Sequence, residues 1–143
     1  MAQAMSQLFL DIDGVLNHSV VYTQFDYPRL FPEHCALLNH IIATTGCSLV
    51  LQSNWKHLLL LGTISQYLRT AGITAPLIGA TPYIGKRGSE VRAYRGESRE
   101  PYVILDDLAD YFPDQPLVLT QNEAGLTTEL AEIAIDILTR GKS

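Results

Sequence analysis

One short stretch constrains this chain more than any other: residues 8–17, LFLDIDGVLN, in which an apolar run stops abruptly at two aspartates and a glycine. The run predicts a buried β-strand, and ligands of open parallel sheets bind at the carboxyl ends of the strands. Asp11 and Asp13 would project to the same side of an extended segment, so their charges would be crowded unless a cation or a proton lay between them. Gly14 would let the backbone turn tightly and bring amide groups toward an anion. The stretch therefore indicates a metal and anion site, with an ordinary Asp-Gly hairpin turn as the alternative.

Segments with strand and helix signals alternate along the rest of the chain. We expect strands at 47–52, 77–79, 102–105 and 117–119, the last at or near a sheet edge. We expect helices from Phe31 to Gly46, from an N-cap at Thr63 to Gly72, from Gly88 to Tyr94 and from about Thr127 to Arg140. This alternation predicts a mainly parallel sheet covered by helices on both faces. The expected fold class is a single doubly wound α/β domain over residues 1–143.

Three local patterns give further expectations. Residues 18–30 mix aromatic and polar side chains, which predicts an irregular loop or short hairpin beside the site. The four leucines at 58–61 fit either a helical turn or an exposed contact surface. The last helix should bury one side, made of Leu126, Leu130, Ile133, Ile137 and Leu138.

Charge is unevenly distributed along the sequence. The formal net charge of −5 argues against a protein that coats nucleic acid non-specifically. Half of the ten Lys and Arg residues nevertheless lie between positions 86 and 99: Lys86, Arg87, Arg92, Arg95 and Arg99. This cluster is either a solvated helix face, partly paired with Glu90, Glu97 and Glu100, or a basic border to the site.

The cysteines and histidines give no sign of a zinc site or a disulfide. Cys35 and Cys47 lack CxxC spacing, and the four histidines are not spaced like metal ligands. Only His18, just after the first motif, is placed where it could touch a substrate. The first residues lack the basic and apolar parts of a signal peptide, and no stretch approaches the ~20 apolar residues of a membrane span. We therefore expect a cytoplasmic protein.

Four motifs, taken in order, resemble those of a known superfamily. They are residues 8–17, the strand that ends in QSNWK (52–56), Lys86-Arg87-Gly88, and YVILDD (102–107). The set is similar to that of the haloacid dehalogenase (HAD) superfamily of aspartyl-nucleophile phosphatases. It most resembles the small HAD domains associated with nucleic-acid repair proteins, in which a similar SxW[RK], TP, RG and LDD series precedes a VLT and GLT ending. Residues 118–120 and 125–127 supply that ending here.

The resemblance implies covalent catalysis that depends on Mg²⁺. Asp11 would attack phosphorus and form an aspartyl-phosphate, and the Asp13 side chain would act first as acid and then as base. Mg²⁺, a hard cation that prefers oxygen ligands, would be held by the Asp11 carboxylate, the Asp13 carbonyl and a carboxylate from Asp106 or Asp107. Taken alone, the last two residues would also fit a helix N-cap or a turn.

The resemblance also implies which residues hold the phosphate. Ser53 would donate to a phosphoryl oxygen, and Lys86 or Arg87 would balance the charge that develops there, without the sequence choosing between them. Lys56 stands where related sequences often have Arg and is a second candidate contact, although Lys lacks the bidentate fork. Asn54 and Gly14 complete the predicted substrate-binding residues.

The chain has no room for the cap domain that many HAD enzymes insert over the site. The segments at 17–31 and 79–86, where a cap would enter, are too short for a domain. An open site would suit the phosphorylated end of a nucleic acid. The alternatives are a small phosphometabolite or a phosphoprotein as substrate, or a non-catalytic module of the same fold that binds phosphate or a partner.

Overall fold

Five parallel strands form one sheet in the order β3-β2-β1-β4-β5. The computed structural model describes residues 6–18, 30–57 and 59–140, so most of the expected loop at 18–30, together with Leu58, lies outside the described residues. The strands are β1 (Gln7–Leu10), β2 (Ser48–Leu51), β3 (Leu77–Ala80), β4 (Tyr102–Asp106) and β5 (Leu117–Leu119). This confirms the doubly wound α/β class and places β5 at an edge of the sheet.

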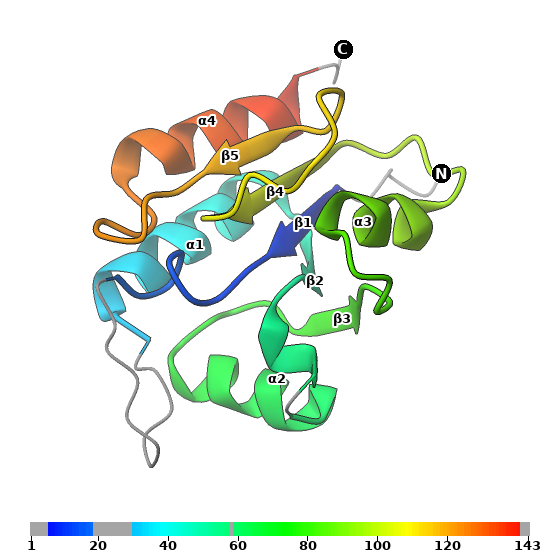
Figure 1. Cartoon of the computed structure of the whole chain (residues 1–143). Helices are drawn as coiled ribbons and strands as arrows, with labels where there is room; N and C mark the ends of the chain where they lie inside the picture. Colours follow the sequence, from blue (N-terminus) through cyan, green and yellow to red (C-terminus); the bar gives the residue numbers. More distant parts are fainter. Residues whose placement is uncertain (1–5, 19–29, 58, 141–143) are drawn as a thin grey trace, which may run out of the picture.

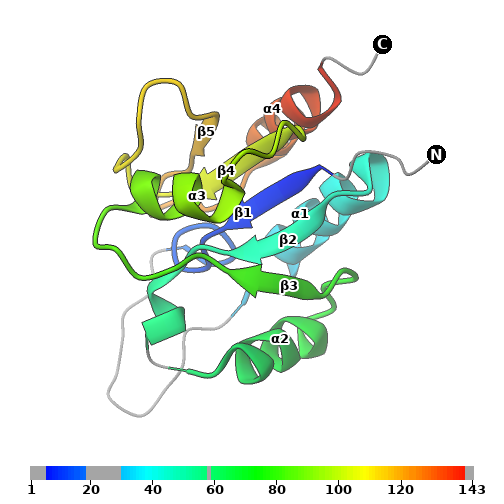
Figure 2. The ribbon, with the colours of Figure 1, turned by 90° about the vertical axis from the view of Figure 1, so that its right-hand side faces the viewer.

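Helices cover both faces of the sheet. They are α1 (Pro32–Thr45), α2 (Leu61–Thr70), α3 (Arg87–Arg95) and α4 (Thr128–Thr139), with a short 3₁₀ helix, η1 (Asn54–His57), after β2. Figures 1 and 2 show α3 on one face and α1 and α4 together on the other. None of the helices in the described residues is both long and apolar enough to span a membrane.

The apolar residues of β1 explain why this strand is central. Leu8, Phe9 and Leu10 are all 0% exposed, as expected for a parallel strand with helices on both of its faces. Leu8 and Leu10 contribute to the larger core cluster with α1, α2 and α4, whereas Phe9 faces α3. Phe9 pairs in register with Val50 of β2 and Ile104 of β4, so the carboxyl ends of all three strands meet at one edge of the sheet.

The helix boundaries show which local signals were decisive. Thr127 caps α4 as expected, because its hydroxyl accepts a hydrogen bond from the Leu130 amide at 3.2 Å. The predicted N-cap at Thr63 is wrong: α2 begins at Leu61, and the Thr63 amide already donates to the Leu60 carbonyl at 3.0 Å. Of the leucine run, only Leu61 belongs to α2, and Leu60 is its N-cap residue, 80% exposed.

The predicted burial of α4 is wrong at one position. Ile133 is 48% exposed, whereas Ala131, Ala134 and Leu138 are fully buried. Because successive residues are about 100° apart around a helix, the face that presents Ala134 to the sheet turns Ile133 toward water. The small alanines, rather than the largest apolar side chain, mark the side of α4 that packs on the core.

Candidate active site

Carboxylates gather where β1 and β4 end. The Asp11 amide extends the sheet by donating to the Leu105 carbonyl at 3.0 Å, and Asp106 is the last residue of β4. Asp11 is 3% exposed and Asp106 is fully buried. Carboxylate oxygens of Asp11, Asp106 and Asp107 all lie within 4.8 Å of one another. The structure thus brings together three residues that the sequence assigned to one metal site.

Burial and the charge of neighbouring carboxylates oppose the ionisation of Asp11 and Asp107. Burial and then the neighbouring Asp106 carboxylate raise the pKa of Asp11 well above its ordinary value, although Arg87 acts in the opposite direction. Burial likewise raises the pKa of Asp107. When the three carboxylates are ionised, the described ion pairs give them one cation, the Arg87 guanidinium. Negative charge then remains unbalanced. An oxygen-only donor set with this charge fits a hard divalent cation.

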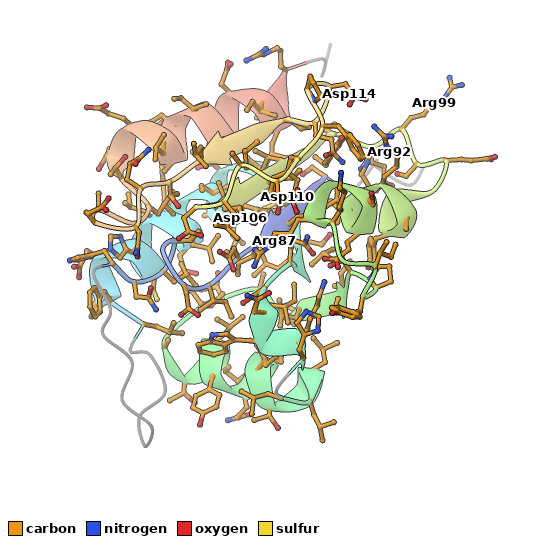
Figure 3. The ribbon with its side chains drawn as sticks, in the orientation of Figure 1. Arg87, Arg92, Arg99, Asp106, Asp110 and Asp114 are labelled. Carbon is orange, nitrogen blue, oxygen red and sulfur yellow. The ribbon has the colours of Figure 1, made fainter. Side chains whose placement is uncertain are left out.

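Arg87 is the cation that the fold brings to the cluster. It is the first residue of α3, and its Nη1 lies 2.7 Å from Asp106 Oδ2 and 3.5 Å from Asp11 Oδ1 (Figure 3). Its Nη2 donates to Asn54 Oδ1 at 3.1 Å. Burial alone would lower the pKa of Arg87, but the Asp106 and Asp11 carboxylates raise it above its ordinary value, so the side chain stays charged.

Lys86, the other candidate for the basic position, has different surroundings. It is the N-cap residue of α3 and is exposed. Among the described residues, no ion pair or hydrogen bond of its side chain is found. The two adjacent cations are therefore not equivalent: one reaches the aspartates and the other faces solvent.

Asp13 is held by Trp55 of η1 and by Asn17, which lies four residues further along the same motif. Its Oδ2 accepts a hydrogen bond from Trp55 Nε1 at 3.0 Å, and its Oδ1 accepts one from Asn17 Nδ2 at 3.1 Å. Neither Trp55 nor Asn17 was predicted to have a role in the site. Trp55 lies in the second motif, residues 52–56, and Asn17 ends the first, residues 8–17, and these positions were the available signal.

Gly14 allows a close approach that no other residue would permit. Its φ is +81°, and a Cβ at this position would lie 2.3 Å from Asp107 Oδ2. The turn was expected to bring amide groups toward an anion, and the Gly14 amide itself donates to Asn17 Oδ1 at 2.8 Å. Its carbonyl accepts from the Thr120 hydroxyl at 2.6 Å, which ties the turn to the end of β5. Gly14 therefore shapes the site by letting Asp107 pack against the turn.

A cavity of about 190 Å³ opens over these groups. Its lining residues are Asp11, Asp13, Ser53, Asn54, Arg87, Asp107 and Leu108. Ser53 is 2% exposed and follows β2, so the carboxyl ends of the three central strands all contribute to the lining. Two larger hollows, of about 290 and 430 Å³, lie along α2, but no carboxylate lines either of them. The chemistry of the side chains, not the size of the hollow, identifies the site.

Lys56 lies in a buried ion pair and not in the lining of the cavity. Its Nζ is 2.8 Å from Glu90 Oε1 and also donates to the Thr81 hydroxyl at 2.8 Å. Glu90 accepts the amides of Ile84 and Gly85 at 3.0 and 3.1 Å. Burial by itself would raise the pKa of Glu90, but Lys56 and these amides lower it to about 2. The pair therefore holds η1, the β3–α3 connection (81–86) and α3 together.

The other residues of the basic cluster are largely engaged on the protein surface. Arg92 of α3 lies over the Phe112 ring, and its Nη2 is 3.2 Å from Asp114 Oδ1. Figure 3 labels Arg92 and Asp114. Arg95 lies over the Tyr102 ring at 3.7 Å and donates to the carbonyls of Ser98 and Glu100. Arg99 is exposed and points away from the site (Figure 3). The cluster is thus mostly a paired surface, with Arg87 as the member that reaches the cavity.

Two histidines from distant segments meet beside the first motif. His18 Nδ1 and His34 Nε2 are 2.8 Å apart, and His34 Nδ1 is 2.7 Å from the Leu126 carbonyl. With Glu33 they form a second group whose ligand atoms lie within 4.8 Å. The spacing of histidines in the sequence gave no signal of this, because the contact depends on how α1 packs beside the first motif.

Comparison with known proteins agrees with the four motifs. The model of a protein family described as the HAD domain in Swiss Army Knife RNA repair proteins matches residues 7–131. The matched range includes every residue that lines the cavity. A search of curated proteins finds no match for the chain.

Proposed function

Because this chain belongs to the family of HAD domains in Swiss Army Knife RNA repair proteins, we propose that it is a phosphomonoesterase that acts on phosphorylated RNA ends. The observation that carries the proposal is the buried Asp11 at the end of the central strand, facing a cavity that it shares with Asp13, Ser53 and Arg87. HAD domains are usually phosphohydrolases, and no inserted cap covers this edge of the sheet in the described residues. An open edge leaves room for a phosphate that is attached to a polymer.

In the first half of the reaction, Asp11 Oδ attacks phosphorus and the bond from phosphorus to the ribose oxygen breaks. Asp13 donates a proton to the departing oxygen, which gives an RNA hydroxyl and an aspartyl-phosphate. The hydrogen bonds from Trp55 and Asn17 support this role, because they fix the Asp13 carboxyl where it lines the cavity. In the second half, a water attacks the aspartyl-phosphate and gives its proton to Asp13, which restores Asp11 and releases inorganic phosphate.

Arg87 and Ser53 are the groups best placed to stabilise the phosphoryl oxygens as charge develops on them. Both line the cavity, and Asn54 fixes the second guanidinium nitrogen of Arg87 at 3.1 Å. We assign Lys86 no direct part in the reaction, since it faces solvent. Lys56 acts through position, because its buried pair with Glu90 holds the segments around the cavity.

The carboxylates fit Mg²⁺, which would screen the repulsion between Asp11 and the phosphate when bound. The Asp11 carboxylate, the Asp13 carbonyl and Asp107 are the residues that we assign to hold it. Asp107 is favoured over Asp106 because both Asp106 oxygens already have partners. Asp106 Oδ1 accepts from the Leu108 amide at 3.0 Å, and Asp106 Oδ2 accepts from Arg87 and from the Tyr111 hydroxyl.

The test is phosphate release from RNA oligonucleotides phosphorylated at the 3′ or the 5′ end, and from a small aryl phosphate, with Mg²⁺ or with EDTA. We expect release from RNA ends that EDTA abolishes and that Asp11→Asn reduces by several orders of magnitude. Asp136→Asn, a change of the same type on the exposed surface of α4, serves as the control and should keep wild-type activity. Equal turnover with EDTA would contradict the metal assignment. Tight binding of the phosphorylated RNA without turnover would instead identify a non-catalytic module.

A further inference from the structure

An aromatic side chain stands exposed on the β3–α3 connection (81–86). Tyr83 is 76% exposed, and the neighbouring Ile84 is 54% exposed. The Tyr83 ring packs edge-to-face against His57 of η1, with the ring centroids 4.4 Å apart and the planes at 79°. This pair of rings lies in water although the chain has a well-formed core in which aromatic side chains such as Phe9 are buried.

The backbone under both rings is held rigidly. Glu90 accepts the amides of Ile84 and Gly85, which follow Tyr83, and Lys56 donates to the Pro82 carbonyl, which precedes it, at 3.4 Å. Lys56 is itself the residue before His57 in η1. The buried Lys56–Glu90 pair thus fixes both segments that carry the rings, so the two rings would lose little conformational entropy on binding a ligand.

The rings also lie next to the cavity. Asn54, which lines it, begins η1, and His57 ends the same helix. With a rise of about 2.0 Å per residue in a 3₁₀ helix, their backbones are about 6 Å apart along its axis. Figure 2 shows η1 and the β3–α3 connection together at the edge of the sheet where the strands end. The exposed Lys86 is the last residue of the connection and adds positive charge on this side.

We propose that Tyr83 and His57 form a stacking platform for the terminal base of the RNA strand whose end phosphate occupies the cavity. This inference rests on the proposed function and adds to it a means of recognising a nucleotide beside the phosphate. Aromatic faces bind bases with little regard to their identity, because every base presents a π-face. A negatively charged protein gains little from general attraction to RNA. A rigid ring pair beside the cavity supplies the recognition locally instead.

The experiment compares two RNA oligonucleotides that differ only in whether the phosphate-bearing terminal nucleotide has a base or is abasic. The ratio of kcat/KM for the two substrates, and the ratio of their Kd values by fluorescence anisotropy, are measured for wild type, Tyr83→Ala and Tyr83→Phe. We expect wild type and Tyr83→Phe to favour the base-bearing end by about tenfold, within the range for base–aromatic stacking. Tyr83→Ala should bring both ratios close to one. Ile133→Ala, which shortens an exposed apolar residue on α4, is the matched control and should keep the wild-type ratios.

The two measurements separate failure of this inference from failure of the proposed function. If wild type releases phosphate from RNA but its ratios are close to one, or are unchanged in Tyr83→Ala, the platform is excluded and the phosphatase stands. If no phosphate is released from any substrate, the proposed function fails, and the Kd ratios still decide the platform. A change of oligomeric state in Tyr83→Ala with unchanged ratios would show that the rings contact protein, which also overturns the inference.

Discussion

Arg87 and Lys86 are adjacent and carry the same formal charge, but only the Arg87 side chain reaches the aspartates. Arg87→Ala should reduce kcat for a small aryl phosphate by about 10² to 10³, the usual loss when a donor to developing charge is removed. Lys86→Ala should cost less than tenfold, because its side chain faces solvent. Steady-state kinetics of both variants at saturating Mg²⁺ provide the measurement. Similar losses in the two variants would contradict the assignment of Arg87.

Gly14 and Gly46 allow the cost of a positive φ to be separated from the cost of a lost contact. Both have positive φ, +81° and +69°, but a Cβ at Gly46 would meet nothing within 4 Å, whereas one at Gly14 would meet Asp107. Each Ala variant should lose about 1–2 kcal/mol of unfolding free energy from the backbone conformation alone. Gly14→Ala should lose more than this and also lose Mg²⁺-dependent turnover, because Asp107 must move. Urea unfolding measures the stability of both variants, and phosphate release measures their activity. Wild-type activity in Gly14→Ala would show that Asp107 need not pack against the turn.

At the scale of the elements, the Lys56–Glu90 pair joins η1, the β3–α3 connection and α3. Lys56→Met leaves a buried carboxylate without its cation and should cost about 3–5 kcal/mol of unfolding free energy. Adding Glu90→Gln removes that charge while keeping an oxygen for the Ile84 and Gly85 amides, so the double variant should be more stable than Lys56→Met. A double-mutant cycle by urea unfolding measures the coupling. Additive losses would show that the two side chains do not act as a pair.

The same pair predicts a dependence of stability on pH. The Glu90 pKa falls from an ordinary value of 4.5 to about 2 in the folded protein, so the folded state binds this proton less readily than the unfolded chain. Its contribution, on the order of 3 kcal/mol, is complete above pH 4.5 and is lost as the pH falls toward 2. The gap in unfolding free energy between wild type and Glu90→Gln should therefore shrink over this interval. A gap that stays constant from pH 6 to pH 2.5 would contradict the burial of an ionised Glu90.

At the scale of the whole molecule, the sequence predicted what depends on chain order and apolar pattern. The alternation of segments predicted the parallel sheet, and the apolar run before Asp11 predicted a buried strand, which lies at the centre of that sheet. The same logic placed Asp106 and Asp107 at the edge where Asp11 lies, because parallel strands end together. Which of the two cations after residue 85 would reach that edge depends on the rotation of α3, and sequence pattern alone does not determine it.

Contacts between distant segments were the part that the sequence did not reveal. The bond of Trp55 to Asp13, the contact of His18 with His34 and the pairing of Lys56 with Glu90 all arise from packing of separate elements. The predicted burial of Ile133 was wrong for a related reason, because the side of α4 that packs inward is determined by the fit of small alanines against the core. The periodicity of apolar residues in a helix does not predict which of its sides fits the surface that it packs against.

The turn at Gly14 is completed by residues that come more than a hundred positions later in the chain. Its carbonyl is held by the Thr120 hydroxyl, and the next residue, Val15, accepts the amide of Leu126. On the ribosome, Asp11, Ser53, Arg87 and Asp106 have therefore all been synthesised before the segment that fastens the turn emerges. A nascent chain that ends after β4 would carry these four side chains without the bonds that support the turn, so the turn is completed only after Leu126 has been synthesised.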